Sequence, residues 1–346
     1  MSDNLKVLVG ISAGVDSAYT LSYLKNAGYD VSAAYLIMTD DGSDITKAKK
    51  VADEAGVQFF SVDCRKEFRD FVVADFINEY KIGRTPNPCV VCNRFVKIEK
   101  LVEFALSNGF DKVATGHYAD VRFENGLYSV YRSHDSKKDQ SYMLWRLTQF
   151  QLSKLLLPLS KIEKSDVRVK AQELNLSSAN TKDSLDICFI PDGDYAKFLT
   201  TNGISDVPGR FVSASGKFLG KSKGIINYTV GQRRGLGLAM DKSVYVTRID
   251  AETNMVTVDY EDGIYSECFT VSNTNFIGIE NADSLNQDDI FVKIRYAATP
   301  QKCSVIRHGD IYEIQSYDKP FRAVTPGQSA VFYNGDGKLL FGGYIN

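Results

Sequence analysis

Two short segments of this 346-residue chain carry residues suited to chemistry, and the first is the loop Ser-Ala-Gly-Val-Asp-Ser at residues 12–17. An apolar run at residues 5–11, typical of a strand buried in a parallel sheet, precedes it, and a helical pattern at residues 18–27 follows it. Backbone N–H groups at a helix N-terminus favour an anion, so the loop is suited to bind phosphate. Ser12 or Asp16 could instead cap the helix, and the local sequence leaves both interpretations open.

The second segment, residues 83–93, presents Cys89 and Cys92 after two prolines that impose an extended backbone. A third cysteine, Cys188, lies much later in the chain, in the tetrapeptide Ile-Cys-Phe-Ile. A Cys-x-x-Cys pair alone is compatible with half a zinc site, a redox pair or chance. With three histidines and no second Cys-x-x-Cys pair, a four-cysteine zinc site is poorly supported.

The hydrophobic pattern predicts the elements that must position these segments. Strand-like runs alternate with helical patterns through the first part of the chain, and this alternation predicts an α/β domain with a doubly wound parallel sheet. The strands are expected at residues 5–11, 31–38, 57–62 and 112–115, and the helices at residues 18–27, 45–55, 68–80, 95–107, 140–147 and 164–174. In such a sheet, ligands bind at the carboxyl ends of the strands.

The composition and hydrophobic pattern of the sequence change near residue 204, where glycines become frequent and short β-rich runs replace helical patterns. This pattern predicts a small β-rich central domain and a C-terminal β-barrel. We place the three domains at residues 1–200, 201–262 and 263–346. The N-terminus lacks the pattern of a signal or transit peptide, and no apolar stretch is long enough to span a membrane, so we expect a cytoplasmic protein with reduced thiols and no membrane contact.

Charge is segregated along the chain although the net charge is only −2. Residues 209–248 contain eight Lys or Arg residues and one acid, whereas residues 249–292 contain ten acids and neither Lys nor Arg. This segregation favours a basic surface for a polyanion within an acidic protein. Folding could instead mix both segments on one solvated surface.

The loop at residues 12–17 resembles the SGGxDS loop of the ATP pyrophosphatases, or PP-loop enzymes, which cleave ATP to AMP and pyrophosphate. It departs from that pattern at Ala13, where glycine is more usual and where a methyl group could strain a positive φ or crowd pyrophosphate. The resemblance becomes specific through further motifs in family order, and it then covers nearly the whole chain. These motifs are GRTPNPxxxCN, ATGHYA, KDQSYML, ICFI, YTVGQRRGLG and TPGQSAVFY, and with them the chain is identified as a member of the tRNA-specific 2-thiouridylase family.

This resemblance implies a PP-loop (HUP-type) catalytic domain and an enzyme that replaces the C2 oxygen of the wobble uridine by sulfur in tRNAs for Lys, Glu and Gln. ATP with Mg²⁺ would adenylate the oxygen, so that it leaves as AMP after pyrophosphate is released. By similarity, Cys188 carries the sulfur as a persulfide and Cys92 is the nucleophile that releases it, leaving a Cys92–Cys188 disulfide. The sulfur would come from a cysteine desulfurase or a sulfur-relay protein.

Cys89 stands where many members of the family carry aspartate, and this leaves a second mechanism open. Cys89, Cys92 and Cys188 could ligate an iron–sulfur cluster with one open iron for sulfide. The chain could also be a PP-loop enzyme of another kind, such as an adenylating amide ligase, or a catalytically silent tRNA-binding module.

Residue-by-residue resemblance also predicts binding sites. The predicted ATP-binding residues are Gly10, Ile11, Ser12, Ala13, Gly14, Val15, Asp16, Ser17, Leu36 and Gly116. The predicted contacts to the tRNA anticodon stem-loop are His117, Lys138, Asp139, Gln140, Arg295, Tyr296 and Gln328. Basic residues such as Arg233 and Arg234 would hold the phosphate backbone.

Overall fold

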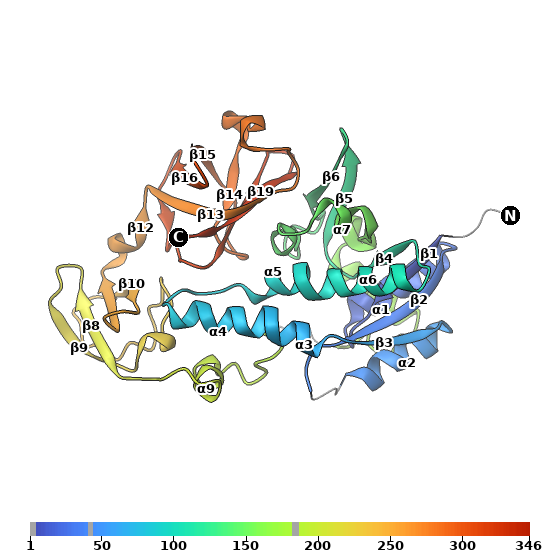
Figure 1. The fold of residues 1–346 in the computed structure, drawn as a ribbon, viewed down its shortest axis with the longest axis horizontal. Helices are drawn as coiled ribbons and strands as arrows, with labels where there is room; N and C mark the ends of the chain where they lie inside the picture. The colour runs from blue at the N-terminus through green and yellow to red at the C-terminus, as the bar shows by residue number, and fades with distance from the viewer. Residues whose placement is uncertain (1–4, 41–43, 182–186) are drawn as a thin grey trace.

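The computed structural model describes residues 5–40, 44–181 and 187–346 (Figure 1). Its N-terminal part is built on the predicted parallel sheet, in which all neighbouring strands are parallel. The strand order is β3 (Phe59–Asp63), β2 (Asp30–Ile37), β1 (Lys6–Gly10), β4 (Lys112–Ala114) and β7 (Leu155–Leu156). The sequence did not indicate β7, because a two-residue strand leaves no periodic signal.

Both faces of this sheet are covered by helices, which confirms the doubly wound architecture. Val7 and Val9 of β1 pack with α1 (Val15–Asn26) and α2 (Ile45–Ala55), whereas Leu8 between them packs with α6 (Ile98–Ser107). Successive side chains of a strand point to opposite faces, so one uninterrupted apolar run supplies both cores.

The helices after β3 contain two π-helical turns. The chain passes from α3 (Arg65–Glu67) through the π-helix η1 (Phe68–Val73) into α4 (Ala74–Lys81), and from α5 (Pro88–Cys92) through the π-helix η2 (Asn93–Lys97) into α6. These two helical stretches pack against each other through η1, α5 and η2, and α4 lies beneath the barrel in Figure 1. Single π turns inside helices occur often at functional sites.

One predicted helix is wrong. Residues 140–147 form only the 3₁₀ turn η3 (Ser141–Leu144). The reason is that side chains of this segment bind the barrel instead of packing along one face of a helix. The Tyr142 hydroxyl donates to the Ser329 carbonyl at 2.7 Å, and Trp145 Nε1 donates to Ser329 Oγ at 3.0 Å. The segments flanking this turn form β5 (Ala119–Glu124), β6 (Leu127–Arg132), α7 (Gln149–Lys154), η4 (Pro158–Lys161) and α8 (Lys164–Glu173).

The β-rich character of the rest of the chain is also confirmed. After α9 (Tyr195–Thr201), a four-stranded sheet has the order β10 (Tyr245–Asp250), β11 (Met255–Asp259), β8 (Gly209–Ser213) and β9 (Phe218–Ser222). The turns η5 (Ile225–Asn227) and η6 (Glu261–Ile264) complete this part, and β12 (Tyr265–Ser266) pairs with β17 (Phe321–Arg322).

The C-terminal part is a closed barrel. Its order is β13 (Cys268–Phe276), β16 (Ile311–Ser316), β15 (Gln301–His308), β14 (Phe291–Lys293), β18 (Ser329–Tyr333) and β19 (Leu339–Ile345), with the turns η7 (Ala282–Ser284) and η8 (Gln287–Asp289). The barrel sits directly on the N-terminal part, because β19 packs against Trp145 so closely that a Cβ at Gly342 would lie 2.5 Å from the indole. Within the described ranges, no helix has the length and apolar character needed to cross a membrane.

Candidate active site

The loop between β1 and α1 has the geometry of an anion site. Gly14 is the N-cap of α1, and no side chain caps the helix there. The two serines bind each other instead, with Ser12 N donating to Ser17 Oγ at 3.0 Å and the two hydroxyl oxygens 3.1 Å apart. The helix N-terminus is therefore not closed by side-chain capping, and its amide groups can face a phosphate.

The predicted ATP-binding residues come together at the carboxyl edge of the sheet. Gly10 ends β1 and pairs with Ala34 of β2, and Leu36 lies two residues further along the same strand. Gly116 follows β4 and approaches the loop so closely that a Cβ there would lie 2.9 Å from Ser17 N. Glycine is thus required at residue 116 by packing against the loop.

Ala13 causes no backbone strain of the kind its substitution for glycine suggested. Among the described residues, the non-glycine positions with positive φ are Asn125, Asn175, Asn254, Asn273 and Ala323, and Ala13 is not one of them. An alanine at this position is compatible with the observed loop backbone.

Asp16 is held by two residues that the sequence analysis missed. The Tyr118 hydroxyl donates to Asp16 Oδ1 at 2.8 Å, and Lys164 Nζ donates to Asp16 Oδ2 at 2.5 Å. Lys164 is only 7% exposed, although lysine is a residue that usually reaches solvent. The pair places a buried ammonium group beside the phosphate loop. No local pattern could have indicated the contact of Lys164 with Asp16, because Lys164 is 148 residues further along the chain and is there only the first residue of a helix.

The cysteines surround the same edge of the sheet. Cys92 is 4% exposed and lies in an apolar cluster with Cys64 and Phe68, and its Sγ is 3.9 Å from Sδ of Met38, the residue that follows β2. Cys89 and Cys188 are exposed, and all six cysteines are free thiols. Phe189, next to Cys188, packs against the cluster that contains Cys92.

The positive charge of Lys97 acts to lower the pKa of both Cys92 and Cys188. Burial raises the pKa of Cys92 to about 12, and the positive charge of Lys97 acts in the opposite direction. Although residue 188 is exposed, the protein around its thiol partly desolvates it and raises the pKa of Cys188, again opposed by the charge of Lys97. Burial and the charge of Lys97 lower the pKa of His117 to about 3, so His117 is neutral at physiological pH. His117 Nδ1 lies 2.8 Å from Thr115 Oγ1.

The three cysteines do not form a preorganised metal site. Among the described residues, which include Cys89, Cys92 and Cys188, no group of three or more His, Cys, Asp or Glu side chains is arranged to hold a metal ion. An iron–sulfur cluster needs thiolates converging on one point, and Cys89, Cys92 and Cys188 as placed form no such ready-made group.

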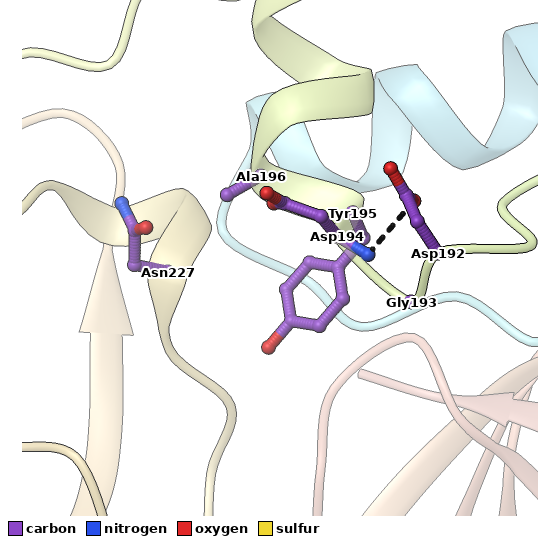
Figure 2. A pocket seen from close by; sticks show the side chains of 6 residues that line it. All are labelled: Asp192, Gly193, Asp194, Tyr195, Ala196 and Asn227. Carbon is purple, nitrogen blue, oxygen red and sulfur yellow. Dashed lines mark hydrogen bonds between the residues drawn. The ribbon is translucent and has the colours of Figure 1, made fainter.

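A cavity of about 340 Å³ lies beyond the Cys188 segment. Figure 2 shows its lining side chains, from the start of α9 on one side and Asn227 of η5 on the other. Within it, the backbone N–H of Asp194 donates to Asp192 Oδ1 at 3.1 Å. None of the predicted site residues lines this cavity.

The predicted tRNA contact Asp139 lies inside the protein. It is 3% exposed, and its carboxylate accepts from the backbone N–H groups of Ser133 at 3.1 Å and Ser141 at 3.2 Å and from Arg132 Nε at 3.2 Å. These hydrogen bonds hold the segment around Asp139 in place, and its contact with tRNA stays a prediction.

Several other predicted contacts also hold segments together. Gln140 Oε1 accepts from Tyr118 N at 2.9 Å, and Gln328 Nε2 donates to the carbonyls of Thr85 and Pro86 at 3.0 and 3.1 Å, which ties β18 to the segment before Cys89. Arg295 donates to the Arg322 carbonyl at 3.0 Å.

Two predicted tRNA contacts keep accessible surface, and one of them lies near Cys89. Tyr296 is 37% exposed, its ring lies 6.1 Å from that of Tyr142, and the charge of Cys89 contributes to raising its pKa after the larger effect of burial. Lys138 is half-buried. The partly exposed ring is suited to stack against a base.

The cations of the central sheet and its connections lie on the surface. All eight are exposed: Arg210, Lys217, Lys221, Lys223, Arg233, Arg234, Lys242 and Arg248. Arg210 and Lys221 stand directly opposite each other on β8 and β9, a like-charge pair that weakens a sheet unless an anion compensates it. These eight cations are thus accessible, but Arg248 Nη2 lies 3.8 Å from Asp250 Oδ2 on the same strand, and a continuous basic surface stays a prediction.

A parallel sheet with an uncapped loop–helix anion site at its carboxyl edge defines a nucleotide-binding α/β protein, here fused to two β-rich domains. Family models match the chain in three consecutive parts: a "tRNA methyl transferase HUP domain" over residues 5–192, a "tRNA methyl transferase PRC-barrel domain" over 196–259 and an "Aminomethyltransferase beta-barrel domain" over 266–345.

Curated relatives match the chain from end to end. The tRNA-specific 2-thiouridylase MnmA of Acetivibrio thermocellus is 41% identical and covers 98% of each chain, and MnmA 1 of Caldanaerobacter subterraneus subsp. tengcongensis is 42% identical over 100% of this chain and 98% of the relative. A solved 4-thiouridine synthetase–RNA complex with bound ATP is 17% identical, with a TM-score of 0.34 over 57% of this chain and 50% of that chain. The chain belongs to the tRNA-specific 2-thiouridylase family.

Proposed function

We propose that this protein uses ATP to replace the C2 oxygen of the wobble uridine by sulfur in tRNAs for Lys, Glu and Gln. Membership of the 2-thiouridylase family makes it a tRNA-modifying sulfurtransferase. The observation that best supports the proposed chemistry is that Cys92 and the phosphate loop share one edge of the sheet, since Cys92 contacts Met38 at the end of β2 and the loop follows β1.

In the activation step, the uridine C2 oxygen attacks the α-phosphorus of ATP and pyrophosphate leaves into the loop of residues 12–17. The N-terminal amide groups of α1 stabilise the departing charge. Lys164 supplies a cation at the same place, beside Asp16. Mg²⁺ would accompany the ATP phosphates, and Asp16 is the carboxylate of the loop that could approach it if its bonds to Tyr118 and Lys164 were exchanged.

In the transfer step, the terminal sulfur of a Cys188 persulfide attacks C2, and AMP leaves with the oxygen. The Cys92 thiolate then attacks the sulfur of Cys188 and forms the Cys92–Cys188 disulfide, so that the bonding electron pair stays with the sulfur on C2. The two thiols supply the two electrons that reduce the sulfane sulfur. A dithiol reductant restores them, and a cysteine desulfurase or relay protein reloads exposed Cys188.

We assign residues 1–200 to catalysis, 201–262 to the tRNA backbone and 263–346 to the barrel that helps to hold the anticodon stem-loop. The uridine must leave its stack to reach the α-phosphate, at a cost of a few kcal/mol that is smallest in a flexible loop. The exposed cations of the central domain would hold phosphates, so tRNA affinity should fall steeply with salt.

The decisive test is mass spectrometry of tRNA nucleosides after incubation with ATP, Mg²⁺ and persulfide-loaded enzyme. We expect Cys188→Ser to abolish 2-thiouridine while leaving tRNA binding and pyrophosphate release intact, and Asp16→Ala to remove pyrophosphate release as well. Cys268→Ser is the matched control, because Cys268 is equally exposed but lies on the barrel strand β13. Thiolation that survives Cys188→Ser would refute the persulfide route, and tRNA binding without any thiolation would indicate a silent binding module.

The iron–sulfur mechanism has its own test. Anaerobic purification followed by iron and acid-labile sulfide assays should find substoichiometric iron. Stoichiometric iron together with thiolation in the absence of a persulfide donor would overturn the persulfide mechanism in favour of a cluster.

A further inference from the structure

The segment that carries Cys188 is attached to the protein by an aromatic side chain that no function described above uses. Phe189 is half-buried, and its ring lies edge-on to Phe68 at 5.5 Å and to Phe76 at 5.4 Å, and 5.3 Å from that of Phe198. Phe68 and Phe76 come from η1 and α4, and Phe198 comes from α9. Edge-on aromatic contacts of this kind stabilise beyond the area they bury.

The same ring joins two separate apolar clusters. One contains Cys92 and Phe68, and the other contains Phe76 and Ile190, with Phe189 packed against both. Ile190 is 3% exposed, and its N–H donates to the Ile187 carbonyl at 2.9 Å, which closes a tight turn over Cys188. The exposed thiol of Cys188 is thus held between a closed backbone turn and a docked ring.

This attachment matters because the two thiols must meet. A disulfide requires Cα atoms within about 7 Å of each other, and Cys92 is buried in the protein whereas Cys188 is exposed. An exposed segment without an anchor would sample many positions, and each sulfur would encounter the other rarely.

We propose that Phe189 is a positioning residue, whose docking into the aromatic pocket of Phe68, Phe76 and Phe198 sets the effective concentration of Cys188 toward Cys92. The proposal rests on the assignment of these two thiols as the redox pair. The pocket defines where the persulfide is presented, and it leaves the sulfur itself open to the donor.

The test measures the thiol pair without tRNA. The full chain is equilibrated in glutathione redox buffers, in which both thiols are oxidised to one internal disulfide while one glutathione disulfide is reduced to two glutathiones. The Cys92–Cys188 disulfide is quantified by peptide mass spectrometry. We expect Phe189→Ala to lower the effective concentration by about a hundredfold, the cost typical of a small misplacement, and to slow thiolation equally while pyrophosphate release in a single turnover is unchanged.

Two further variants distinguish a loss of Cys188 positioning from a general loss of protein stability. Phe189→Leu refills the pocket and should restore most of the effective concentration. Phe104→Ala is the matched control, since Phe104 is another half-buried ring that packs edge-on, against Phe60 at 5.2 Å, away from the Cys188 segment. The proposal is overturned if Phe189→Ala keeps the parent value or if Phe104→Ala lowers it equally. A parent protein that forms no such disulfide would contradict the proposed redox pair itself.

Discussion

Replacing Lys97 with methionine should slow every step that needs Cys92 as a thiolate. Burial raises the pKa of Cys92 to about 12, and the charge of Lys97 is the largest influence acting to lower it. At pH 8, a thiol with that pKa is ionised in about one molecule in 10⁴. A nearby opposite charge is worth roughly one to three pKa units, so Lys97→Met should cut the thiolate population, and with it sulfur transfer, by about tenfold or more.

Alkylation by iodoacetamide, followed by mass spectrometry of the separate cysteine peptides, measures this effect directly. The thiolate is the reactive form, so the alkylation rate of Cys92 should rise with pH and be lower in Lys97→Met at each pH. Lys97→Arg keeps the charge and should restore the rate. ATP cleavage should be unaffected, because Lys97 follows Cys92 on η2 and is not part of the phosphate loop.

Cys64 provides an internal control for this experiment. Burial raises its pKa to about 12, like that of Cys92, but the cation acting on it is Lys100, which is paired with Glu67 at 2.9 Å. Lys100→Met should therefore slow alkylation of Cys64 and spare Cys92. A Lys97→Met protein whose Cys92 reacts at the parent rate with the parent pH profile would refute the reasoning, and parallel changes at both cysteines would indicate altered access rather than charge.

Three further outcomes are expected. Lys164→Met removes the ammonium group from Asp16 and leaves a carboxylate without its ion-pair partner, so pyrophosphate release should fall by about a hundredfold, the loss typical of one preorganised electrostatic group, while tRNA binding in filter assays is retained. Gly342→Ala pushes a methyl group into Trp145 and should lower the free energy of unfolding in denaturant titrations by about 1–3 kcal/mol. The pKa of His117 is lowered to about 3, so His117 stays neutral from pH 5 to 8. The pH dependence of tRNA binding over this range should therefore be the same in the parent protein and in His117→Asn.

Much of the fold could be predicted from the sequence because its signals are local. The alternating apolar runs and the loop before α1 each act within a few residues. The prediction for residues 140–147 was wrong because the structure of this segment depends on contacts that are distant in the sequence. Their helical pattern is overridden by contacts of Tyr142 and Trp145 with Ser329 on the barrel, which are close only after folding.

The candidate site divides in the same way. The phosphate loop, Cys92 and Cys188 were indicated by residue types in recognisable motifs. The sequence did not indicate the roles of Lys164, Lys97 and Phe189. A lysine at the start or end of a helical turn has no distinctive pattern, and neither does the packing of a phenylalanine in an apolar segment. Asp139 shows the opposite case, since its motif suggested an RNA contact and its surroundings show three internal hydrogen bonds.

By itself, the sequence determined that a loop of small residues follows a strand buried on both faces, and that thiols and a segment rich in cations accompany it. Only the tertiary structure decided that Lys164 lies on Asp16, 148 residues away, and that Phe189 holds Cys188 against the cluster around Cys92. The physical reason is that periodicity encodes which face of an element is buried. It does not encode which distant elements share that burial, and this depends on the path of the whole chain.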